Sequence, residues 1–129
     1  MTLEQQQRFI LHEHFARHYH FDFRLEHEGV LKSWAVPKGL PERSGERRLA
    51  ISVEDHPLDY IGFQGTIPEG QYGAGEVTIK DNGTFELLIW RDDRIEVLLH
   101  GQAFSGKYIL IRFKKAGEKE WLVFKAKDE

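Results

Sequence analysis

The stretch that decides the fold is His18-Tyr19-His20-Phe21-Asp22-Phe23-Arg24-Leu25, which alternates strictly between polar and apolar side chains. Side chains of a β-strand point alternately to its two faces. One face therefore carries Tyr19, Phe21, Phe23 and Leu25, and the other carries His18, His20, Asp22 and Arg24. The pattern predicts a strand over residues 19–25 with a polar row opposite its apolar row.

Similar short runs, separated by turn residues, fill most of the chain. They cover residues 9–11, 30–36, 49–53, 76–80, 84–90, 94–100, 107–114 and 121–127. Asp81-Asn82-Gly83 predicts a tight turn between two of these runs, and Thr2 with Gln5 has the capping-box spacing of one short N-terminal helix. Many short strands with close turns predict a mainly-β fold, a compact antiparallel β-barrel with at most short helices.

Length, cysteine content and charge exclude several classes of protein. The 129 residues favour a single domain, 1–129. Cysteine is absent, which excludes disulfide frameworks, thiolate metal sites and cysteine nucleophiles. The sequence shows neither a secretory signal nor an apolar run long enough for a membrane helix, so we expect a cytoplasmic protein. A net charge of -3 argues against coating nucleic acid by bulk positive charge.

The polar row beginning at His18 belongs to a segment unusually rich in histidine, with five between residues 12 and 27. His14, His20 and Asp22 make a set of two imidazoles and one carboxylate. Such a set suits Mn²⁺, Fe²⁺ or Zn²⁺ and leaves coordination positions open for water or substrate. His20 and Asp22 point the same way on one strand, and His14 would join them from the preceding turn. His12 is an alternative ligand, and His18 could also face the site.

A second cluster follows the strand at 49–53. Its apolar residues Leu49, Ile51 and Val53 are expected to face the core, which leaves Arg48 and Glu54 free to face a site. His56 lies just past the strand end and suits a general acid or a cationic donor to phosphate. Arg24, Arg48 and Lys38 are candidate phosphate partners. The Gly-rich segment 65–75 lacks a P-loop ending, and we expect it to be structural.

Four motifs, at residues 14–25, 31–39, 53–60 and 67–75, closely resemble the 3′-phosphoesterase domain of bacterial DNA ligase D and its stand-alone relatives. The third reads Val53-Glu54-Asp55-His56-Pro57-Leu58-Asp59-Tyr60, and the fourth reads Ile67-Pro68-Glu69-Gly70-Gln71-Tyr72-Gly73-Ala74-Gly75. The closing Trp121-Leu122-Val123-Phe124-Lys125 resembles the last strand of that family. The resemblance covers nearly the whole chain.

The resemblance implies a β-barrel enzyme that uses Mn²⁺, with Co²⁺ or Zn²⁺ as possible substitutes. It would remove a 3′-terminal ribonucleoside from the primer strand of a DNA or RNA–DNA primer-template, and then the remaining 3′-phosphate, leaving a 3′-hydroxyl. The matching positions assign three groups of residues. The metal ligands are His14, His20 and Asp22, the contacts to the scissile phosphate are Arg24, Arg48 and His56, and the supporting residues are Lys38, Glu54 and Tyr60.

Two departures from the ligase-fused members bear on these expectations. Only thirteen residues precede His14, and they contain no counterpart of those members' functional N-terminal arm. Phosphate hydrolysis is therefore the more strongly implied of the two steps. Neither a polymerase nor a ligase domain accompanies the motifs, so a role in end joining would require separate ligase, polymerase and end-binding proteins.

Three other readings remain open from the residues alone. His20-x-Asp22 with the distant His100 and Arg112 also fits an Fe(II)-dependent oxygenase barrel. His18-x-His20 with Glu26 suggests a cupin-like module. A non-catalytic nucleic-acid-binding barrel could stack bases on Phe63, Tyr72 and Trp90, although we expect these aromatic residues in the core.

Overall fold

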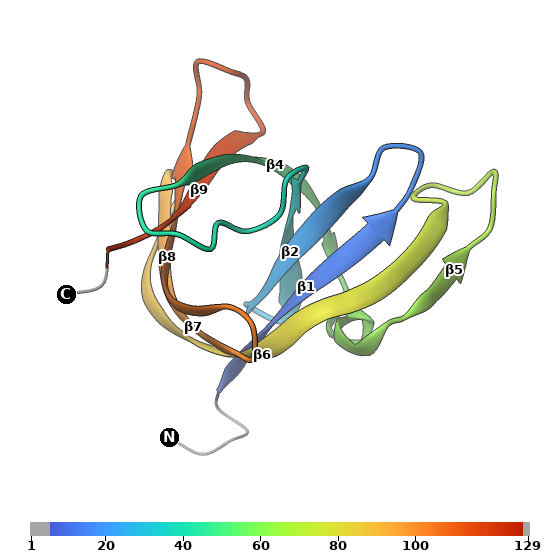
Figure 1. Ribbon diagram of the computed structural model, residues 1–129, viewed down its shortest axis with the longest axis horizontal. Helices are drawn as coiled ribbons and strands as arrows, with labels where there is room; N and C mark the ends of the chain where they lie inside the picture. The colour runs from blue at the N-terminus through green and yellow to red at the C-terminus, as the bar shows by residue number, and fades with distance from the viewer. Residues whose placement is uncertain (1–5, 128–129) are drawn as a thin grey trace.

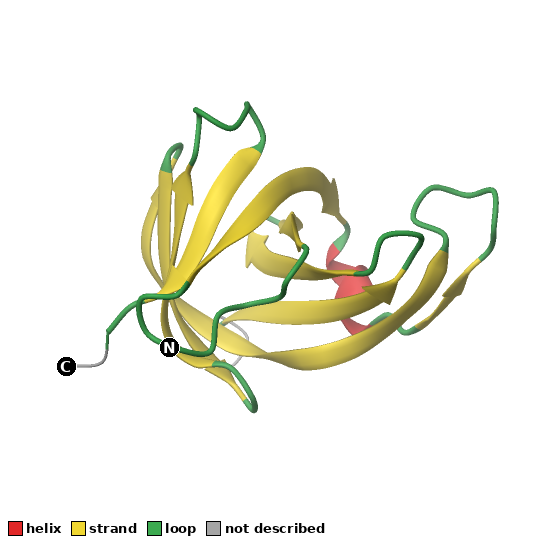
Figure 2. Ribbon diagram, turned by 45° about the horizontal axis from the view of Figure 1, so that its top comes forward, coloured by secondary structure: helices red, strands yellow, loops and turns green. Residues whose placement is uncertain are grey.

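The computed structural model describes residues 6–127, and these residues form nine β-strands and one short 3-10 helix. The strands are β1 (Gln7–Phe15), β2 (His20–His27), β3 (Val30–Val36), β4 (Arg47–His56), β5 (Gly65–Ile67), β6 (Gly75–Arg91), β7 (Arg94–Gly101), β8 (Ser105–Arg112) and β9 (Glu120–Lys125). The helix, η2 (Leu58–Gly62), lies between β4 and β5 (Figure 2).

The sheet closes on itself. Antiparallel pairing runs in the order β1-β2-β3-β4-β9-β8-β7-β6, and β6 also pairs with β1 (Figure 1). Eight strands therefore form a closed barrel, while the short strand β5 pairs with the N-terminal end of β6. The predicted mainly-β fold, a compact antiparallel β-barrel with at most short helices, is confirmed.

Alternate side chains from all eight barrel strands fill the interior. The buried cluster consists of Phe9, Leu11, Phe23, Leu25, Trp34, Val36, Leu40, Ala50, Phe85, Ile95, Val97, Leu99, Phe104, Tyr108, Leu110, Trp121 and Val123. Phe23 and Leu25 of β2 point inward, as the alternation predicted. Asp22 and Arg24 consequently lie on the outer surface of the barrel.

The outer surface of β1 and β2 is nevertheless buried. His12 and His14 are 0% and 6% exposed although they alternate with the inward-facing Phe9 and Leu11. The segment from η2 to β5 covers this part of the barrel, and the ring of His12 contacts the carbonyl oxygen of Phe63 in that segment. The fold thus creates a second, polar buried region outside the hydrophobic interior.

The turn predicted at Asp81-Asn82-Gly83 is wrong, because β6 runs through these residues without interruption. The carboxylate of Asp81 accepts three hydrogen bonds, at 2.8 to 3.1 Å, from the backbone N–H groups of residues 102–104. At Gly83 a Cβ would lie 2.2 Å from the carbonyl oxygen of His100 on β7. Asp81 therefore binds the β7–β8 connection, and Gly83 permits the close approach of β7, instead of forming a turn.

The alternation along β4 is the reverse of the predicted one. Ala50 is buried in the interior, whereas Leu49 is 39% exposed, so Ile51 and Val53 also belong to the outer surface. Trp121 of β9 lies directly opposite Ala50 in the strand register. Both residues belong to the buried cluster, so the small Ala50 faces the interior beside the large Trp121.

Two further expectations concern the chain's helices. The N-terminal helix predicted from Thr2 and Gln5 lies outside the described residues. No helix within residues 6–127 has the length and apolar character that crossing a bilayer requires.

We expect Asp81→Ala to lower the free energy of unfolding by about 1–3 kcal/mol, because three backbone N–H groups, one of them fully buried, would lose their acceptor. Chemical denaturation followed by circular dichroism measures the change. The exposed Asp92, in the turn between β6 and β7, provides the control: Asp92→Ala should leave stability nearly unchanged. Equal stability of the two variants would contradict this role of Asp81.

Candidate active site

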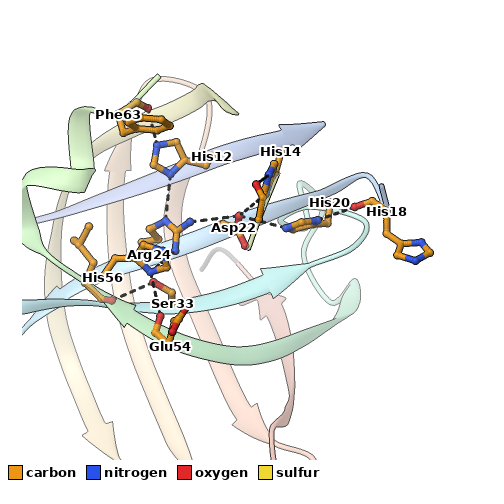
Figure 3. Close-up of polar contacts among 12 residues, drawn as sticks. His12, His14, His18, His20, Asp22, Arg24, Ser33, Glu54, His56 and Phe63 are labelled. Carbon is orange, nitrogen blue, oxygen red and sulfur yellow. Dashed lines mark hydrogen bonds and ion pairs between the residues drawn. The ribbon is translucent and has the colours of Figure 1, made fainter. Parts of the chain in front are cut away.

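A cleft of about 300 Å³ opens on the outer surface of β2, β3 and β4, beside η2 and the β5–β6 loop. Seven of the nine residues predicted for the site line it: His14, His20, Asp22, Arg24, Glu54, His56 and Tyr60. Figure 3 shows how most of these side chains converge from neighbouring strands. The other two, Lys38 and Arg48, lie outside the lining.

His14, His20 and Asp22 meet at one end of the cleft, where one ligand atom of each lies within 4.8 Å of the others. Nδ1 of His14 and Nε2 of His20 lie 3.5 and 3.3 Å from Oδ2 of Asp22. His14 is on β1, directly opposite His20 in the register, so it does not come from a turn as the sequence had suggested. Antiparallel strand pairing alone brings such cross-strand neighbours together.

The hydrogen bonds behind the two histidines orient their rings. Nε2 of His14 lies 2.8 Å from the carbonyl oxygen of Gly73, and Nδ1 of His20 lies 2.8 Å from that of His18. A carbonyl oxygen only accepts, so each of these nitrogens carries the proton in the neutral ring. In that neutral form the opposite nitrogen, on the Asp22 side, presents a lone pair, whereas in the doubly protonated form it donates to the Asp22 carboxylate. Such carbonyl partners are typical of metal-binding histidines.

The electrostatics of Asp22 favour its charged form. Burial by itself would raise the pKa of Asp22, but hydrogen bonds from His14 and His20 and the charge of Arg24 outweigh burial and hold that pKa well below its usual value. The hydrogen bond to Asp22 in turn raises the pKa of His20. The three side chains thus combine a permanent carboxylate with two imidazoles, a donor set that fits a divalent transition-metal ion.

Arg24 is the central cation of the cleft and is only 3% exposed. Its Nε donates to Nδ1 of His12 at 3.2 Å, and its Nη1 lies 3.1 Å from Nδ1 of His56. Its Nη2 lies 3.4 Å from Oδ2 of Asp22. The guanidinium also lies 5.0 Å from the ring centroid of Tyr60. These contacts fix a buried positive charge next to the Asp22 carboxylate.

His12 is the residue whose role the sequence left undecided. Its Nε2 lies 3.0 Å from the carbonyl oxygen of Phe63, and its Nδ1 accepts from Arg24. Burial and the nearby charge of Arg24 lower the pKa of His12 to about 4, so its ring is neutral. Both ring nitrogens are therefore engaged away from the ligand set, and His12 links Arg24 to the segment that covers the barrel. This role of His12 follows from its contacts with Phe63 and Arg24, which the three-dimensional structure alone shows.

His56 and Glu54 reach the cleft through an irregularity in β4. The register between β3 and β4 shifts between Leu31 and Ser33, and such a bulge re-aims side chains at a strand end. Consecutive residues Val53 and Glu54 both line the cleft as a result. Burial and the charge of Arg24 lower the pKa of His56, which favours a neutral ring. Its Nδ1 lies 3.1 Å both from Nη1 of Arg24, which only donates, and from the carbonyl oxygen of Glu54, which only accepts. The tautomer that accepts from Arg24 carries its proton on Nε2.

Arg48 and Lys38 lie apart from the cleft. Nη1 of Arg48 donates to the carbonyl oxygens of Lys38, Gly39 and Leu40, and its Nη2 pairs with Glu46. Arg48 shares the parity of Ala50 along β4, opposite to that of the exposed Leu49. The arrangement gives no support to phosphate binding by Arg48 or Lys38.

The residue sets of the oxygenase and cupin readings are not assembled around this cleft. His100 is exposed and pairs with Glu86, while Arg112 bonds to the carbonyl oxygen of Glu118. His18 is exposed, and its side chain points away from the other histidines (Figure 3). Glu26 pairs with Arg8.

The three aromatic residues of the nucleic-acid-binding reading differ in their surroundings. Trp90 stacks on His27 and packs against the core, and Phe63 stacks on Tyr60 with a centroid distance of 4.9 Å. The expectation that Tyr72 is a core residue is wrong, because it is 81% exposed at the cleft.

A β-barrel that holds two imidazoles, a carboxylate and a buried guanidinium in one cleft has the groups that metal-assisted phosphoryl chemistry requires. Comparison with protein families agrees: residues 12–112 match the DNA Ligase D 3′-phosphoesterase domain. The chain belongs to this family.

The chain is also similar to curated proteins named LigD. The chain is 49% identical over 125 residues to the multifunctional non-homologous end joining protein LigD of Mycobacterium bovis, covering 94% of this chain and 16% of that protein. It is 46% identical over 133 residues to the protein of that name from Mycolicibacterium smegmatis, covering 95% and 17%, and 46% identical over 130 residues to that from Pseudomonas aeruginosa, covering 94% and 15%. The chain thus spans about a sixth of the length of these relatives.

We expect His12→Leu to destabilise the protein by about 1–3 kcal/mol, because the carbonyl of Phe63 and the Nε–H of Arg24 would both lose their partner in a buried setting. Thermal or chemical unfolding in EDTA measures the change without any contribution from a bound ion. His18→Leu is the matched control, since that side chain is exposed. A His12→Leu protein as stable as the control would show that the bridge contributes nothing.

Proposed function

We propose that this chain is a Mn²⁺-dependent hydrolase acting on 3′ ends in DNA repair. Its reactions would be removal of a 3′-terminal ribonucleoside (a phosphodiesterase step) and removal of a 3′-phosphate (a phosphomonoesterase step), leaving a 3′-hydroxyl. Family membership over residues 12–112 supports the phosphoesterase class. Mn²⁺ is the ion that the resemblance implies, and the donor set fits it, with Co²⁺ or Zn²⁺ as substitutes.

The observation that carries the proposal is the convergence of His14, His20 and Asp22 with oriented ring nitrogens. These three residues would hold the ion and leave open positions for substrate. When bound there, a divalent ion would supply Lewis-acid stabilisation of charge on a phosphoryl oxygen. His14 and His20 are each hydrogen-bonded to a backbone carbonyl, which supports a preorganised set of ligands.

The remaining cleft residues would bind the phosphate and move a proton. Arg24, held by contacts with its neighbours, offers fixed positive charge to the phosphate oxygens. His56, in the form that accepts from Arg24, has its Nε2–H to donate to a phosphate oxygen or to the leaving oxygen. Tyr60 keeps its phenolic proton because burial raises its pKa, so it can donate a hydrogen bond. Glu54 at the cleft wall would support the site.

The proposed setting is the repair of broken DNA. The relatives named above are described as non-homologous end joining proteins, and the chain corresponds to only part of each. We infer that this chain acts on the 3′ end of a DNA or RNA–DNA primer-template in the cytoplasm. Ligase, polymerase and end-binding proteins would complete the joining reaction.

We expect His20→Ala, Asp22→Ala and His56→Ala each to lower turnover by at least about 100-fold, because each removes a metal ligand or a proton donor. The measurement is hydrolysis of a labelled primer-template that ends in one ribonucleotide, and of its 3′-phosphate counterpart, with Mn²⁺ or with EDTA. His18→Ala, which leaves the backbone carbonyl to His20 intact, should remain active.

Circular dichroism of every variant separates loss of the site from loss of the fold. Near-normal activity of a folded His20→Ala protein would contradict the assigned site. Equal turnover in Mn²⁺ and in EDTA would contradict metal dependence, and loss of phosphate without loss of the ribonucleoside would restrict the function to the phosphomonoesterase step.

A further inference from the structure

Tyr72 is the most exposed of the large hydrophobic side chains in the described part of the chain, at 81%. The loop that carries it is nevertheless well anchored. The N–H of Gln71 donates to the carbonyl of Pro68, and the carbonyl of Gly73 contacts the ring of His14. An aromatic ring is therefore presented to solvent from a fixed position beside the candidate metal ligands.

The anchoring depends on a close approach of the loop to the β1–β2 hairpin, which it adjoins in Figure 1. At Gly75, where φ is +130°, a Cβ would lie 2.3 Å from the carbonyl oxygen of Phe15. Only glycine permits this contact. Tyr72 is thus placed relative to the cleft by backbone packing rather than by its own side-chain contacts.

Tyr72 also lines a second hollow of about 560 Å³, together with Ile51, Ser52, Val53, Glu54 and Lys119. Three of these residues, Val53, Glu54 and Tyr72, line the first cleft as well. The two hollows therefore adjoin at Val53, Glu54 and Tyr72, with Arg24 and His56 in the first and Lys119 in the second. The two hollows together are called the groove.

The charges along this groove suit a chain with phosphates at intervals. Arg24 provides a cation at the cleft end, and the exposed Lys119 provides one at the far end. An exposed tyrosine ring between two cations has the arrangement by which proteins hold single-stranded nucleic acid, with phosphates on cations and a base stacked on the ring. Glu54, the carboxylate in between, disfavours a phosphate at the middle position.

We propose that Tyr72 stacks on the base of the nucleotide whose 3′-oxygen carries the phosphate bound in the cleft, and that Lys119 binds the phosphate on its 5′ side. The polarity follows from the substrate, since further phosphates lie only on the 5′ side of the scissile phosphate, and the 3′ side carries at most one nucleoside. This subsite rests on the proposed function. In both proposed reactions Tyr72 would contact the base of the same nucleotide, the one on the 5′ side of the scissile phosphate.

The test compares 3′-phosphorylated oligonucleotides that carry either a normal or an abasic terminal nucleotide. Base–aromatic stacking predicts that Tyr72→Ala raises KM about tenfold on the normal oligonucleotide and has little effect on the abasic one. Tyr72→Phe keeps the ring and should behave as the wild-type protein. Phe113→Ala removes another exposed aromatic side chain, outside the groove, and should change neither KM.

A second variant tests the phosphate contact proposed for Lys119. Lys119→Ala should raise KM for the oligonucleotide and lower its dependence on salt, because one phosphate contact is lost. It should leave KM for a nucleoside 3′-phosphate, which has no 5′ phosphate, unchanged. A uniform change on both substrates would overturn the placement of Lys119.

Fluorescence anisotropy of the same oligonucleotides in EDTA separates this inference from the proposed function. Absence of Mn²⁺-dependent turnover in the wild-type protein would contradict the proposed function. The subsite would still be supported if Tyr72→Ala weakened binding of the base-containing oligonucleotide alone. Equal effects of Tyr72→Ala on normal and abasic oligonucleotides, in KM and in binding, would overturn it.

Discussion

The buried charge of Arg24 is the constraint on which the rest of the cleft depends. A guanidinium that is 3% exposed must be satisfied by its neighbours, and here the neighbours are His12, His56 and Asp22. They come from β1, β4 and β2, and His12 also connects to the covering segment. Removing the charged partner from such a buried ion pair, here Asp22, typically costs about 3–5 kcal/mol. The arrangement therefore couples the geometry of the site to the stability of the fold.

Closure of the barrel makes this arrangement possible. Because β1 pairs with both β2 and β6, it has a neighbouring strand on each side. Both of its faces are also buried. The inner face carries Phe9 and Leu11, and the outer face carries His12 and His14 under the segment from η2 to β5. A small domain thus keeps a continuous apolar interior and still holds a desolvated polar cleft, in which charges interact more strongly than they would in water.

The loop between β5 and β6 connects the site to its surroundings. Through Gly73 it orients His14, and through Tyr72 it borders the groove that continues past Val53 and Glu54. Its glycines allow the close backbone contact with the β1–β2 hairpin that makes both roles possible. The Gly-rich segment 65–75, which the sequence predicted to be only structural, therefore belongs to the candidate active site.

The sequence by itself determined the β class, most strand positions and the two faces of β2, because alternation with period two is a local property of the backbone. It also singled out His14, His20 and Asp22.

Tertiary structure decided what depends on distant partners. Ala50, opposite Trp121, faces the interior while Leu49 is exposed, and Asp81 accepts from backbone N–H groups of residues 102–104 within one continuous strand. Phe63 and Arg24 occupy the two ring nitrogens of His12, and Arg48 donates to the carbonyls of residues 38–40. Such contacts join residues far apart in the chain, so no local pattern encodes them.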